Sequence, residues 1–328
     1  MVRILDGASV ESLIDLGALL PVIERAFRRQ HSGAVERPAR PHYPIGIGLD
    51  PNDPEEPVGT GLVMPAYIHG DEYFVTKLVS VHEKNPDRDL PTIHAQIAVN
   101  EAATGIPVAY MDGNFVTAAR TSCIGGLSAR ELTSGAITVG LIGAGTQARW
   151  QVRAISRATA IEEVAFYDLD EPTVEAAVDE LSTELEVPVR EATTPIDAIE
   201  NADVVVTATT SADPVFPGDA LADGTVVVAI GAYTSDMQEI DPTTFDRAAL
   251  VFADVPEEVA EIGDLTATGL TEEDLVPFSK MLDGESGRSS PEEIIVVESV
   301  GSAVMDAAAA GHIYDRARER DVGAEFEL

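Results

Sequence analysis

The sequence predicts an α/β fold, and three observations near its centre carry this prediction. Residues 138–142 form a short apolar run that leads directly into the glycine-containing loop Gly143–Ala148. Apolar residues then recur at helical spacing. A second apolar run, at 164–167, ends in Asp168, twenty residues beyond Ala148. A strand, a glycine loop, a helix, a second strand and an acid in this order are typical of a Rossmann unit.

The loop indicates that this unit binds a dinucleotide. Gly143 permits a tight turn, Gly145 lets the backbone approach a pyrophosphate, and Ala148 allows the helix to pack closely on the strand. The free N–H groups and the positive dipole end of that helix face the phosphates. The carboxylate of Asp168 is placed to accept a ribose 2′-hydroxyl and repels a 2′-phosphate, so NAD is expected rather than NADP. The alternative is a glycine turn in an unrelated α/β protein, which does not account for the order of all five features.

The elements before the loop predict a separate α+β portion. Helical periodicity predicts an amphipathic helix over 9–30 with Ser9 as its N-cap, and 117–133 is also helical. Between these two helices, the sequence predicts strands and turns over 38–70 and strands at 73–81, 92–99 and 107–111. Because the glycine loop begins only near residue 140, the nucleotide domain is not the first domain of the chain.

Further strands and one long helix follow the loop. Apolar runs predict strands at 203–207, 225–230 and 249–252, with helical patterns between most of them. The last segment, 299–320, is rich in alanine and helical, and it can return to the first domain.

The charge balance excludes several classes of partner. The chain has 57 acidic and 21 basic side chains and a net charge of −36, which is unfavourable for binding nucleic acid. The acids are dispersed among apolar residues, and lysine is scarce, so we interpret the composition as an adaptation to high salt. No apolar run suits a membrane span, and no cluster has the spacing of a metal site. The single cysteine, Cys123, and the lack of a signal-peptide pattern at Met1 predict a cytoplasmic protein.

Three basic residues in otherwise neutral surroundings are candidates for binding an anionic substrate. Lys77 is the only charged residue between Glu72 and Glu83, and Arg120 the only one between Asp112 and Arg130. Lys77 is suited to hold a carboxylate or to activate a water, and Arg120 to bind a carboxylate with its guanidinium fork. Arg40 is a third candidate. The alternatives are an edge-strand lysine, a structural arginine that binds backbone carbonyls, and a solvated loop arginine, respectively.

At these residues the chain resembles the ornithine cyclodeaminase/mu-crystallin family. The resemblance extends over nearly the whole chain and runs through segments 38–40, 64–67, 75–79, 104–113, 116–121, 143–148, 204–209, 229–232, 239–241 and 299–301, together with Asp306. It implies a homodimer in which a Rossmann NAD-binding domain, residues 118–298, is inserted into an α+β substrate-binding and dimerisation domain, residues 1–117 completed by the C-terminal helix 299–328. Arg40, Lys77 and Arg120 match the family residues that hold the substrate carboxylate.

The resemblance also implies the reaction class. Members of the family use NAD(P) to oxidise an amino acid or to reduce an imine. Ornithine cyclodeaminases carry an aspartate where this chain has Tyr233, and Asp236 lies three residues later, as in ketimine reductases. We therefore expect an NAD-dependent oxidoreductase acting on the C–N bond of a small amino or imino acid, of the alanine dehydrogenase or ketimine reductase type. Ornithine cyclodeamination to proline and ammonia, and a non-catalytic crystallin-like ligand-binding dimer, remain the alternatives.

The predicted site falls into three sets of residues. The expected catalytic residues are Lys77, Arg120 and Asp236, and the expected substrate-binding residues are Arg40, Lys77 and Arg120. The expected cofactor-binding residues are Gly143, Gly145, Thr146, Gln147, Ala148, Asp168, Thr207, Thr209 and Gly231.

Overall fold

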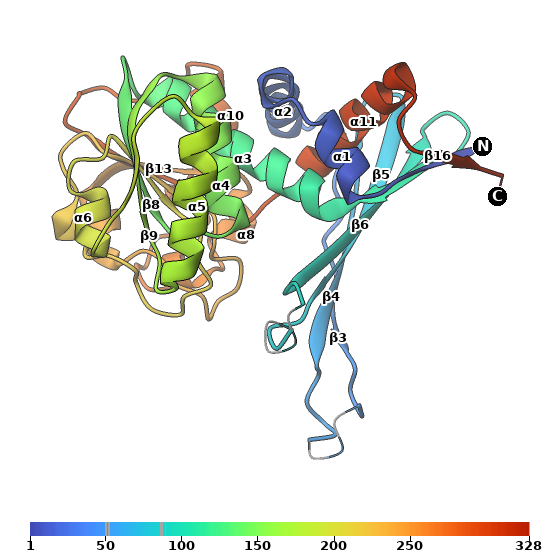
Figure 1. Cartoon of the computed structure of the whole chain (residues 1–328), viewed down its shortest axis with the longest axis horizontal. Coiled ribbons are helices and arrows are strands. Elements are labelled where there is room, and N and C mark those ends of the chain that lie inside the picture. Colours follow the sequence, from blue (N-terminus) through green and yellow to red (C-terminus); the bar gives the residue numbers. More distant parts are fainter. Residues whose placement is uncertain (50, 52, 86–87, 89, 328) are drawn as a thin grey trace. The chain divides into compact units, whose positions relative to one another are not determined.

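A computed structural model describes residues 1–49, 51, 53–85, 88 and 90–327, which form two compact units (Figure 1). Unit 1 comprises Met1–Asp15, Arg29–Arg120 and Ala303–Leu328, and unit 2 comprises Leu16–Arg28 and Thr121–Ser302. Each unit is built on its own β-sheet. The predicted combination of a Rossmann domain with a second, α+β domain is confirmed.

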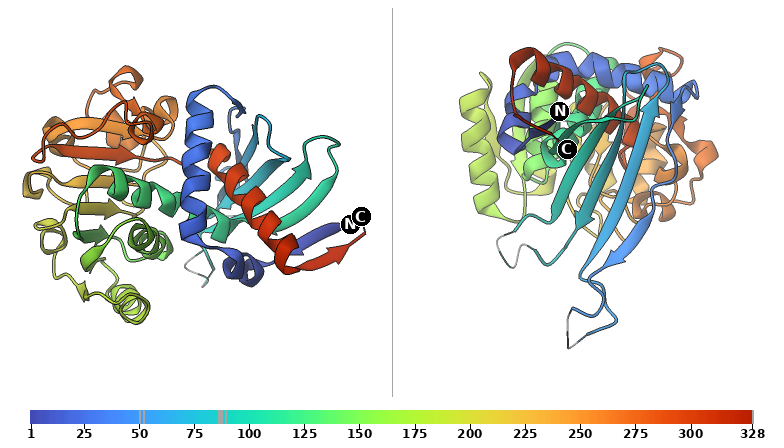
Figure 2. Two further views of the ribbon diagram at one scale, coloured as in Figure 1. Left: turned by 90° about the horizontal axis from the view of Figure 1, so that it is seen from above. Right: turned by 90° about the vertical axis from the view of Figure 1, so that its right-hand side faces the viewer.

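Unit 1 contains a mixed sheet. Its strands are β1 (Val2–Leu5), β2 (Val35–Glu36), β3 (His42–Ile45), β4 (Gly59–Ile68), β5 (Tyr73–Val81), β6 (Ile93–Glu101), β7 (Pro107–Asp112) and β16 (Ala324–Phe326). They lie in the order β16-β1-β7-β6-β5-β4-β2, and β3 also pairs with β4. The β1–β7 pair is parallel and the other pairs are antiparallel. The two ends of the chain therefore meet at the β1–β16 edge (Figure 2).

One face of this sheet is covered by helix α11 (Ala303–Arg320), which packs on β4, β5 and β6 (Figure 2). Burial alternates along the central strands, as the period of two in a strand requires. Val75, Ile97 and Val99 face the covered side and are fully buried. Leu78 and Tyr110, which belong to the opposite set of positions, each keep 41% of their surface exposed. The face opposite α11 therefore exposes large apolar side chains.

The predicted helix over 9–30 is wrong in one respect, because the structure has two helices there. Helix α1 (Gly7–Leu13) ends before Asp15, and α2 (Leu16–His31) begins directly after it. The N-cap of α1 is Asp6, whose carboxylate accepts a hydrogen bond from the backbone of Ser9. An aspartate carboxylate is as good a cap as a serine hydroxyl, so the helix starts earlier than expected.

Unit 2 contains an all-parallel sheet of the doubly wound type. Its strands are β8 (Ile137–Ile142), β9 (Ile161–Tyr167), β10 (Val189–Glu191), β11 (Val204–Thr207), β12 (Val226–Ala229), β13 (Ala248–Ala253), β14 (Val276–Pro277) and β15 (Ile294–Glu298). They lie in the order β10-β9-β8-β11-β12-β15-β13-β14. The strand order turns back between β8 and β11, which is the position where such sheets bind ligands.

The core of unit 2 explains why its strands read as continuous apolar runs. The strands β11, β12 and β15 are buried along their whole length, since the sheet is covered on both faces. The helices that follow β8 in this unit are α4 (Thr146–Ala158), α5 (Glu171–Glu184), α6 (Pro195–Ile199), α7 (Pro242–Arg247), α8 (Pro256–Val259), α9 (Gly263–Thr266) and α10 (Phe278–Leu282). Strand β15 was not among the predicted strands, although it lies between β12 and β13.

Helix α2 packs in unit 2, although the sequence places residues 1–117 in the first domain. The rings of Phe27 and Phe278 lie 4.8 Å apart between centroids. Arg28 donates to the carbonyl of Leu282 at 2.7 Å and forms an ion pair with Asp283 at 2.8 Å. The helix buries its apolar side among residues far away in the chain, and this choice of partner is not visible in its own periodicity.

The last predicted helix before the glycine loop is α3 (Gly113–Leu132), which starts earlier than the expected residue 117. The carboxylate of Asp112 accepts hydrogen bonds from the backbone of Asn114 and Phe115, both at 3.0 Å. This side-chain cap satisfies the first free amides of the helix and explains its earlier start.

Candidate active site

Unit 1 holds a buried cluster of charged side chains centred on Asp306. Lys77 extends from β5, which is flanked by β4 and β6, and it retains only 2% of its surface exposure. Its Nζ lies 2.7 Å from Oδ2 of Asp306, on α11, and 3.4 Å from the hydroxyl of Thr117, on α3. The alternative interpretation of Lys77 as a solvated edge-strand lysine is therefore wrong, because the side chain is buried in the middle of the sheet.

Arg120 reaches the same carboxylate from another helix. It lies on α3 and is buried, and its Nε donates to Oδ1 of Asp306 at 3.0 Å. Asp306 is fully buried, and each of its oxygens is paired with one cation. A guanidinium group has five N–H donors, and this contact uses one of them.

The electrostatics of this cluster depend on burial and on mutual pairing. Burial lowers the pKa of Lys77, and the positive charges of Arg120 and Arg40 lower it further. The negative charge of Asp306 raises it, but by less, so that the pKa of Lys77 is about 8. Burial disfavours the ionised form of Asp306, but Lys77 and Arg120 outweigh burial and lower the pKa of Asp306. At neutral pH the group thus contains two buried cations and one buried anion.

Arg40 completes the predicted set of cations. It lies in the segment between β2 and β3 and is partly exposed. Its charge is close enough to Lys77 to disfavour the protonated form of the lysine and so to lower its pKa. The structure therefore brings Arg40, Lys77 and Arg120 into one electrostatic neighbourhood in unit 1.

The glycine loop in unit 2 has the geometry that a bound pyrophosphate requires. Gly143 has φ +98°, and a Cβ at this position would lie 2.6 Å from the carbonyl oxygen of Ala208, so only glycine is tolerated. A Cβ on Gly145 would meet no atom within 4 Å, so the space beside it is open. Helix α4 begins at Thr146 without a side-chain hydrogen bond at its N-cap, which leaves its first amides available to a phosphate.

The other residues of this loop are arranged consistently with that role. Thr146 is exposed, Gln147 is partly buried, and Ala148 is fully buried against the sheet. Asp168 follows β9, and its Oδ2 accepts a hydrogen bond from the amide of Ala144 at 2.8 Å. Asp168 therefore supports the loop, and it remains partly exposed at the position where a ribose is expected.

Thr207, Thr209 and Gly231 meet at a carboxylate that was not among the predicted site residues. The hydroxyls of Thr207 and Thr209 and the amides of Thr209 and Gly231 all donate to Glu239, over distances of 2.6–3.0 Å. Thr207 has no exposed surface, and its hydroxyl is directed to Glu239. These three residues lie where β11 and β12 end, at the carboxyl edge of the parallel sheet.

The segment that follows β12 carries the predicted catalytic acid. Asp236 is exposed, and a hydrogen bond from Thr234 lowers its pKa, so it is ionised at neutral pH. Tyr233 is partly buried and packs against the hydrophobic core of unit 2.

Two functional candidates, Asp306 and Glu239, had no role predicted from the sequence. Asp306 is the only acidic residue between Glu298 and Asp315, in a run of small apolar residues. The same criterion that selected Lys77 and Arg120 would have selected it. Glu239 lies close to Asp236 and Asp241, so nothing in the local sequence distinguishes it from other acids of this acid-rich chain.

The described residues contain no group of three or more His, Cys, Asp or Glu side chains that could hold a metal ion. Within the same residues, no helix combines the length and the apolar character needed to cross a membrane.

Comparisons with known proteins identify the family and the fold. Residues 2–321 match the ornithine cyclodeaminase/mu-crystallin family. The chain is 32% identical to an alanine dehydrogenase of Archaeoglobus fulgidus over 99% of its own length and 98% of the relative. Its fold is similar to that of Δ1-pyrroline-2-carboxylate reductase of Thermococcus litoralis in complex with NADH and L-proline, with a TM-score of 0.92, 28% identity and coverage of 99% and 100% of the two chains. It is also similar to an archaeal alanine dehydrogenase dimer with bound NAD, with a TM-score of 0.90, 30% identity and coverage of 100% and 99%.

Proposed function

The chain belongs to the ornithine cyclodeaminase/mu-crystallin family, and on that premise we propose that it is an NAD-dependent oxidoreductase acting on the C–N bond of a small amino or imino acid. The proposed type is an alanine dehydrogenase or a ketimine reductase. One observation carries the proposal: two buried cations share a single buried carboxylate in a chain whose net charge is −36.

The surplus positive charge in this cluster favours an anionic substrate. Lys77 and Arg120 together carry two positive charges, and Asp306 balances one of them. Burying a net charge is costly unless a counter-charge arrives. A substrate carboxylate is such a counter-charge, and Arg120 retains further N–H donors with which to bind it. Arg40 adds positive potential from the adjacent segment.

The residues of unit 2 fit the other half of the reaction. The open space beside Gly145 and the uncapped start of α4 suit a pyrophosphate, and Asp168 suits a ribose. When bound, NAD supplies the hydride acceptor for oxidation at Cα, and NADH supplies the donor for reduction of an imine. Lys77 orients the carboxylate while protonated, and in its neutral form it can accept a proton from a water at Nζ.

Tyr233 and Asp236 favour net oxidation or reduction over cyclodeamination. A tyrosine hydroxyl with a reference pKa of about 10 carries no charge that would attract a distal amine at neutral pH. Asp236 is proposed as the acid that serves the reacting nitrogen, since it is exposed and ionised. Ornithine cyclodeamination is the second candidate, because the family that the chain matches includes that activity in its name.

A screen for NADH formation over the amino acids, in high salt, tests the proposed reaction. NADH formation with a small amino acid, or NADH consumption with a 2-oxo acid plus ammonia or with a cyclic imine, is the expected result. Stoichiometric proline and ammonia from L-ornithine without NADH would establish cyclodeamination instead. NADH binding without turnover of any amino or imino acid would favour the crystallin-like alternative.

We also propose that the protein is a homodimer that buries the uncovered face of the sheet in unit 1. One row of neighbouring side chains crosses five strands and contains Pro65, Thr76, Ala98, Tyr110 and Ile4. None of these residues is charged, in a chain where acids are otherwise dispersed. An uncharged patch of this kind on an acidic protein is typical of a protein–protein interface.

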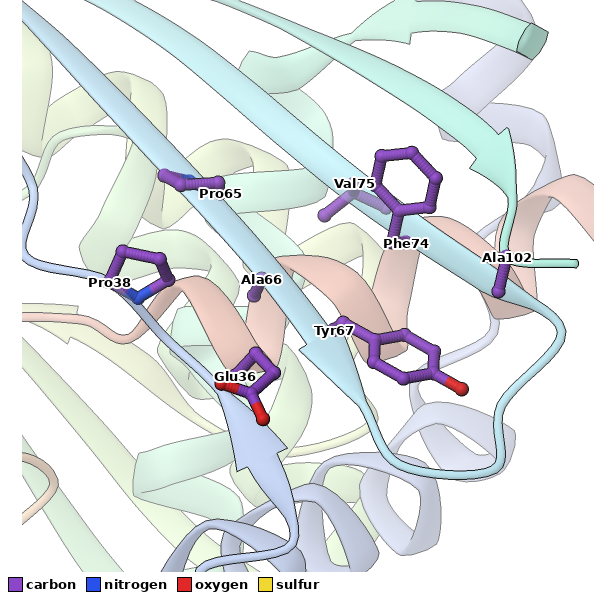
Figure 3. A pocket seen from close by; sticks show the side chains of 8 residues that line it. All are labelled: Glu36, Pro38, Pro65, Ala66, Tyr67, Phe74, Val75 and Ala102. Atoms are coloured by element: carbon purple, nitrogen blue, oxygen red, sulfur yellow. The ribbon is translucent and has the colours of Figure 1, made fainter. Parts of the chain in front are cut away.

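A shallow pocket at the edge of the uncovered face of the sheet in unit 1 supports the proposed dimer interface. The pocket has a volume of about 350 Å³ and is lined by Glu36, Pro38, Pro65, Ala66, Tyr67, Phe74, Val75 and Ala102 (Figure 3). It contains none of the cations of the Asp306 cluster, so it does not suit the substrate. The alanine dehydrogenase with a similar fold is a dimer, which agrees with a second copy as the partner. A monomer by light scattering at micromolar concentration would contradict the proposal.

We further propose a cytoplasmic protein adapted to high salt. A chain with a single, buried cysteine has no internal disulfide, as is typical of reducing compartments. At a net charge of −36, repulsion between carboxylates opposes folding, and the Debye length falls from about 10 Å at 0.1 M salt to about 3 Å at 1 M. The thermal unfolding midpoint is therefore expected to rise with KCl over this range. A flat or falling midpoint would contradict the adaptation.

A further inference from the structure

Glu239 ties together the ends of two neighbouring strands at the carboxyl edge of the parallel sheet. Its Oε1 accepts hydrogen bonds from the amide of Thr209 at 2.6 Å and from the hydroxyl of Thr209 at 2.8 Å. Its Oε2 accepts from the amide of Gly231 at 2.7 Å and from the hydroxyl of Thr207 at 3.0 Å. Thr207 ends β11, and Gly231 follows β12, so one buried carboxylate connects both strand ends.

Close packing at Gly231 shows how tightly this connection is made. A Cβ on Gly231 would lie 2.2 Å from the carbonyl oxygen of Thr209 and 2.6 Å from Cδ of Glu239. Both contacts are shorter than any side chain tolerates. The backbone of Glu239 is itself held, because its amide donates to Oδ1 of Asp264 at 2.7 Å. Thr209, Gly231 and Glu239 therefore form one rigid junction.

The junction requires an ionised carboxylate. Each oxygen of Glu239 faces one backbone N–H, and a backbone N–H can only donate. A proton on either oxygen removes acceptor capacity that these amides need. Three other acids lie in the neighbourhood: Asp264 on α9, Glu298 on β15, and Asp254, which lies near Glu298.

The position of the junction relates it to the cofactor. In a doubly wound sheet a dinucleotide crosses the point where the strand order reverses, here between β8 and β11. The β8 side carries the glycine loop and, after β9, Asp168, which suit the pyrophosphate and the adenosine ribose. The other half of the cofactor then lies toward the ends of β11 and β12.

We propose that Glu239 is a positioning residue for the nicotinamide half of NAD, because its carboxylate holds the ends of β11 and β12 in the arrangement that receives it. The residue acts through Thr209 and Gly231 and does not itself touch the cofactor. This inference rests on the proposed placement of the cofactor at this edge of unit 2.

The ionisation of Glu239 provides a readout that a purely structural role would not give. Burial raises the pKa of Glu239, and the negative charge of Asp264 also raises it. The hydrogen bonds from Thr209 and Gly231 lower it, and the resulting pKa is about 7. Cofactor binding is therefore expected to strengthen as pH rises through about 7. For a single required ionisation with this pKa, affinity rises about tenfold between pH 6 and pH 8.

The stability of the folded protein without cofactor is expected to decrease over the same rise in pH. The pKa of Glu239 is higher in the folded protein than in the unfolded chain, so the folded state binds this proton more tightly. The contribution of Glu239 to the free energy of unfolding then decreases as pH rises from the ordinary carboxyl range to about 7. Glu239→Gln removes this contribution.

The test is titration of the protein with NADH by fluorescence and by calorimetry from pH 6 to pH 8.5. Glu239→Gln keeps the shape of the side chain but turns an NH₂ group toward one of the two backbone amides. We expect this variant to bind NADH at least about tenfold more weakly at pH 8, as the loss of one charge-assisted acceptor implies, and to lose the pH dependence. Glu24→Gln is the matched control, since it makes the same change in a glutamate of α2 that pairs with Arg28 and Arg130 and lies outside the junction. It should keep the affinity and the pH profile of the wild type.

Two further measurements keep the outcome decisive. If Glu239→Gln does not fold, Thr207→Val tests the same junction: it removes one donor from a side chain that cannot reach the cofactor, and it should weaken NADH binding several-fold. Wild-type protein that binds no NADH at any pH would overturn the proposed function. Wild-type binding that is independent of pH and unchanged in Glu239→Gln, or an equal loss in Glu24→Gln, would overturn this inference and leave the proposed function intact.

Discussion

The two units bury their charged groups in opposite ways. In unit 1, the carboxylate of Asp306 is balanced by Lys77 and Arg120. In unit 2, the fully buried Glu239 has Asp264 and Glu298 as neighbours of like charge, and only neutral groups donate to it. The pKa of Asp306 is lowered, whereas those of Glu239 and Asp264 are raised, to about 7 and about 6.

This difference separates two uses of buried charge. Opposite charges lower the pKa of Asp306 and keep it ionised at neutral pH, and the cluster of Lys77, Arg120 and Asp306 retains one net positive charge. Burial, with a smaller contribution from the charge of Asp264, raises the pKa of Glu239 to about 7, so its ionisation responds to pH and to whatever requires the ionised form. A buried carboxylate that is stabilised by cations is therefore a fixed charge, and one that is stabilised by amides and hydroxyls is an adjustable charge.

The largest effect is expected from removing the central carboxylate of unit 1. Asp306→Ala leaves Lys77 and Arg120 buried with no balancing charge, and breaking a buried pair on one side typically costs about 3–5 kcal/mol. Urea denaturation should show this loss as a lower midpoint with an unchanged slope. An equally stable variant would mean that the cluster is solvated and that the contrast with unit 2 does not exist.

Removing either cation should affect catalysis more than cofactor binding. Lys77→Ala and Arg120→Ala each delete one charge-assisted contact to the substrate carboxylate, which is worth about 1.5–3 kcal/mol, or about ten- to a hundredfold in kcat/KM. The dissociation constant of NADH should change little, because Lys77 and Arg120 belong to unit 1 and the glycine loop to unit 2.

Lys84→Ala provides the control for these variants. Lys84 is exposed and lies outside the cluster, so its removal should leave kcat/KM unchanged. Full activity in a folded Lys77→Ala or Arg120→Ala protein, or a parallel loss of NADH binding, would refute the assigned roles.

The two units should also respond to pH in opposite directions. The pKa of Lys77 is lowered to about 8, so its positive charge is present below this pH and is lost above it. Binding of a non-reactive carboxylate, such as the 2-hydroxy analogue of the substrate, should weaken as pH rises above about 8, by up to about tenfold per pH unit. Lys77→Arg should remove this dependence, because a guanidinium stays protonated. A flat profile up to pH 9.5 in the wild type would contradict the lowered pKa.

The smallest effect concerns the choice between NAD and NADP. Asp168 follows β9 and is partly exposed, and its charge repels a 2′-phosphate. Two like charges about 4 Å apart in water repel by about 1 kcal/mol, so Asp168→Ala should raise NADP affinity about fivefold. Equal or tighter binding of NADP than NAD by the wild type would show that Asp168 does not set the preference.

Much of the Rossmann unit is predictable from the sequence because its signals are local. A glycine loop after an apolar strand needs residues at neighbouring positions, and Gly143, Gly145 and Asp168 were identified in this way. Strand β15 was missed, although it is as apolar as its neighbours. Its apolar run at 294–297 is a local signal of the same kind, and only its pairing with β12 and β13 needs the tertiary structure.

Lys77 and Arg120 were identifiable because each is an isolated charge in a neutral segment, whereas most charges of this chain lie among other charges. The carboxylates that complete the buried groups were not assigned roles. Asp306 belongs to a helix more than 180 positions away from Arg120, and Glu239 reaches Thr207 and Gly231 across two strand ends.

The sequence by itself thus determined the α/β class, the glycine loop after its first strand, and the isolated cations Lys77 and Arg120, since each depends on residue types at short spacing. Only the tertiary structure decided that α2 packs in unit 2, that Asp306 lies between two cations, and that Glu239 joins the ends of β11 and β12. The physical reason is that ion pairs and hydrogen bonds act over a few ångströms in space, and their strength does not depend on how far apart the two residues lie along the chain. Whether an acid in a chain with 57 of them is a surface charge or a buried one is therefore settled by packing.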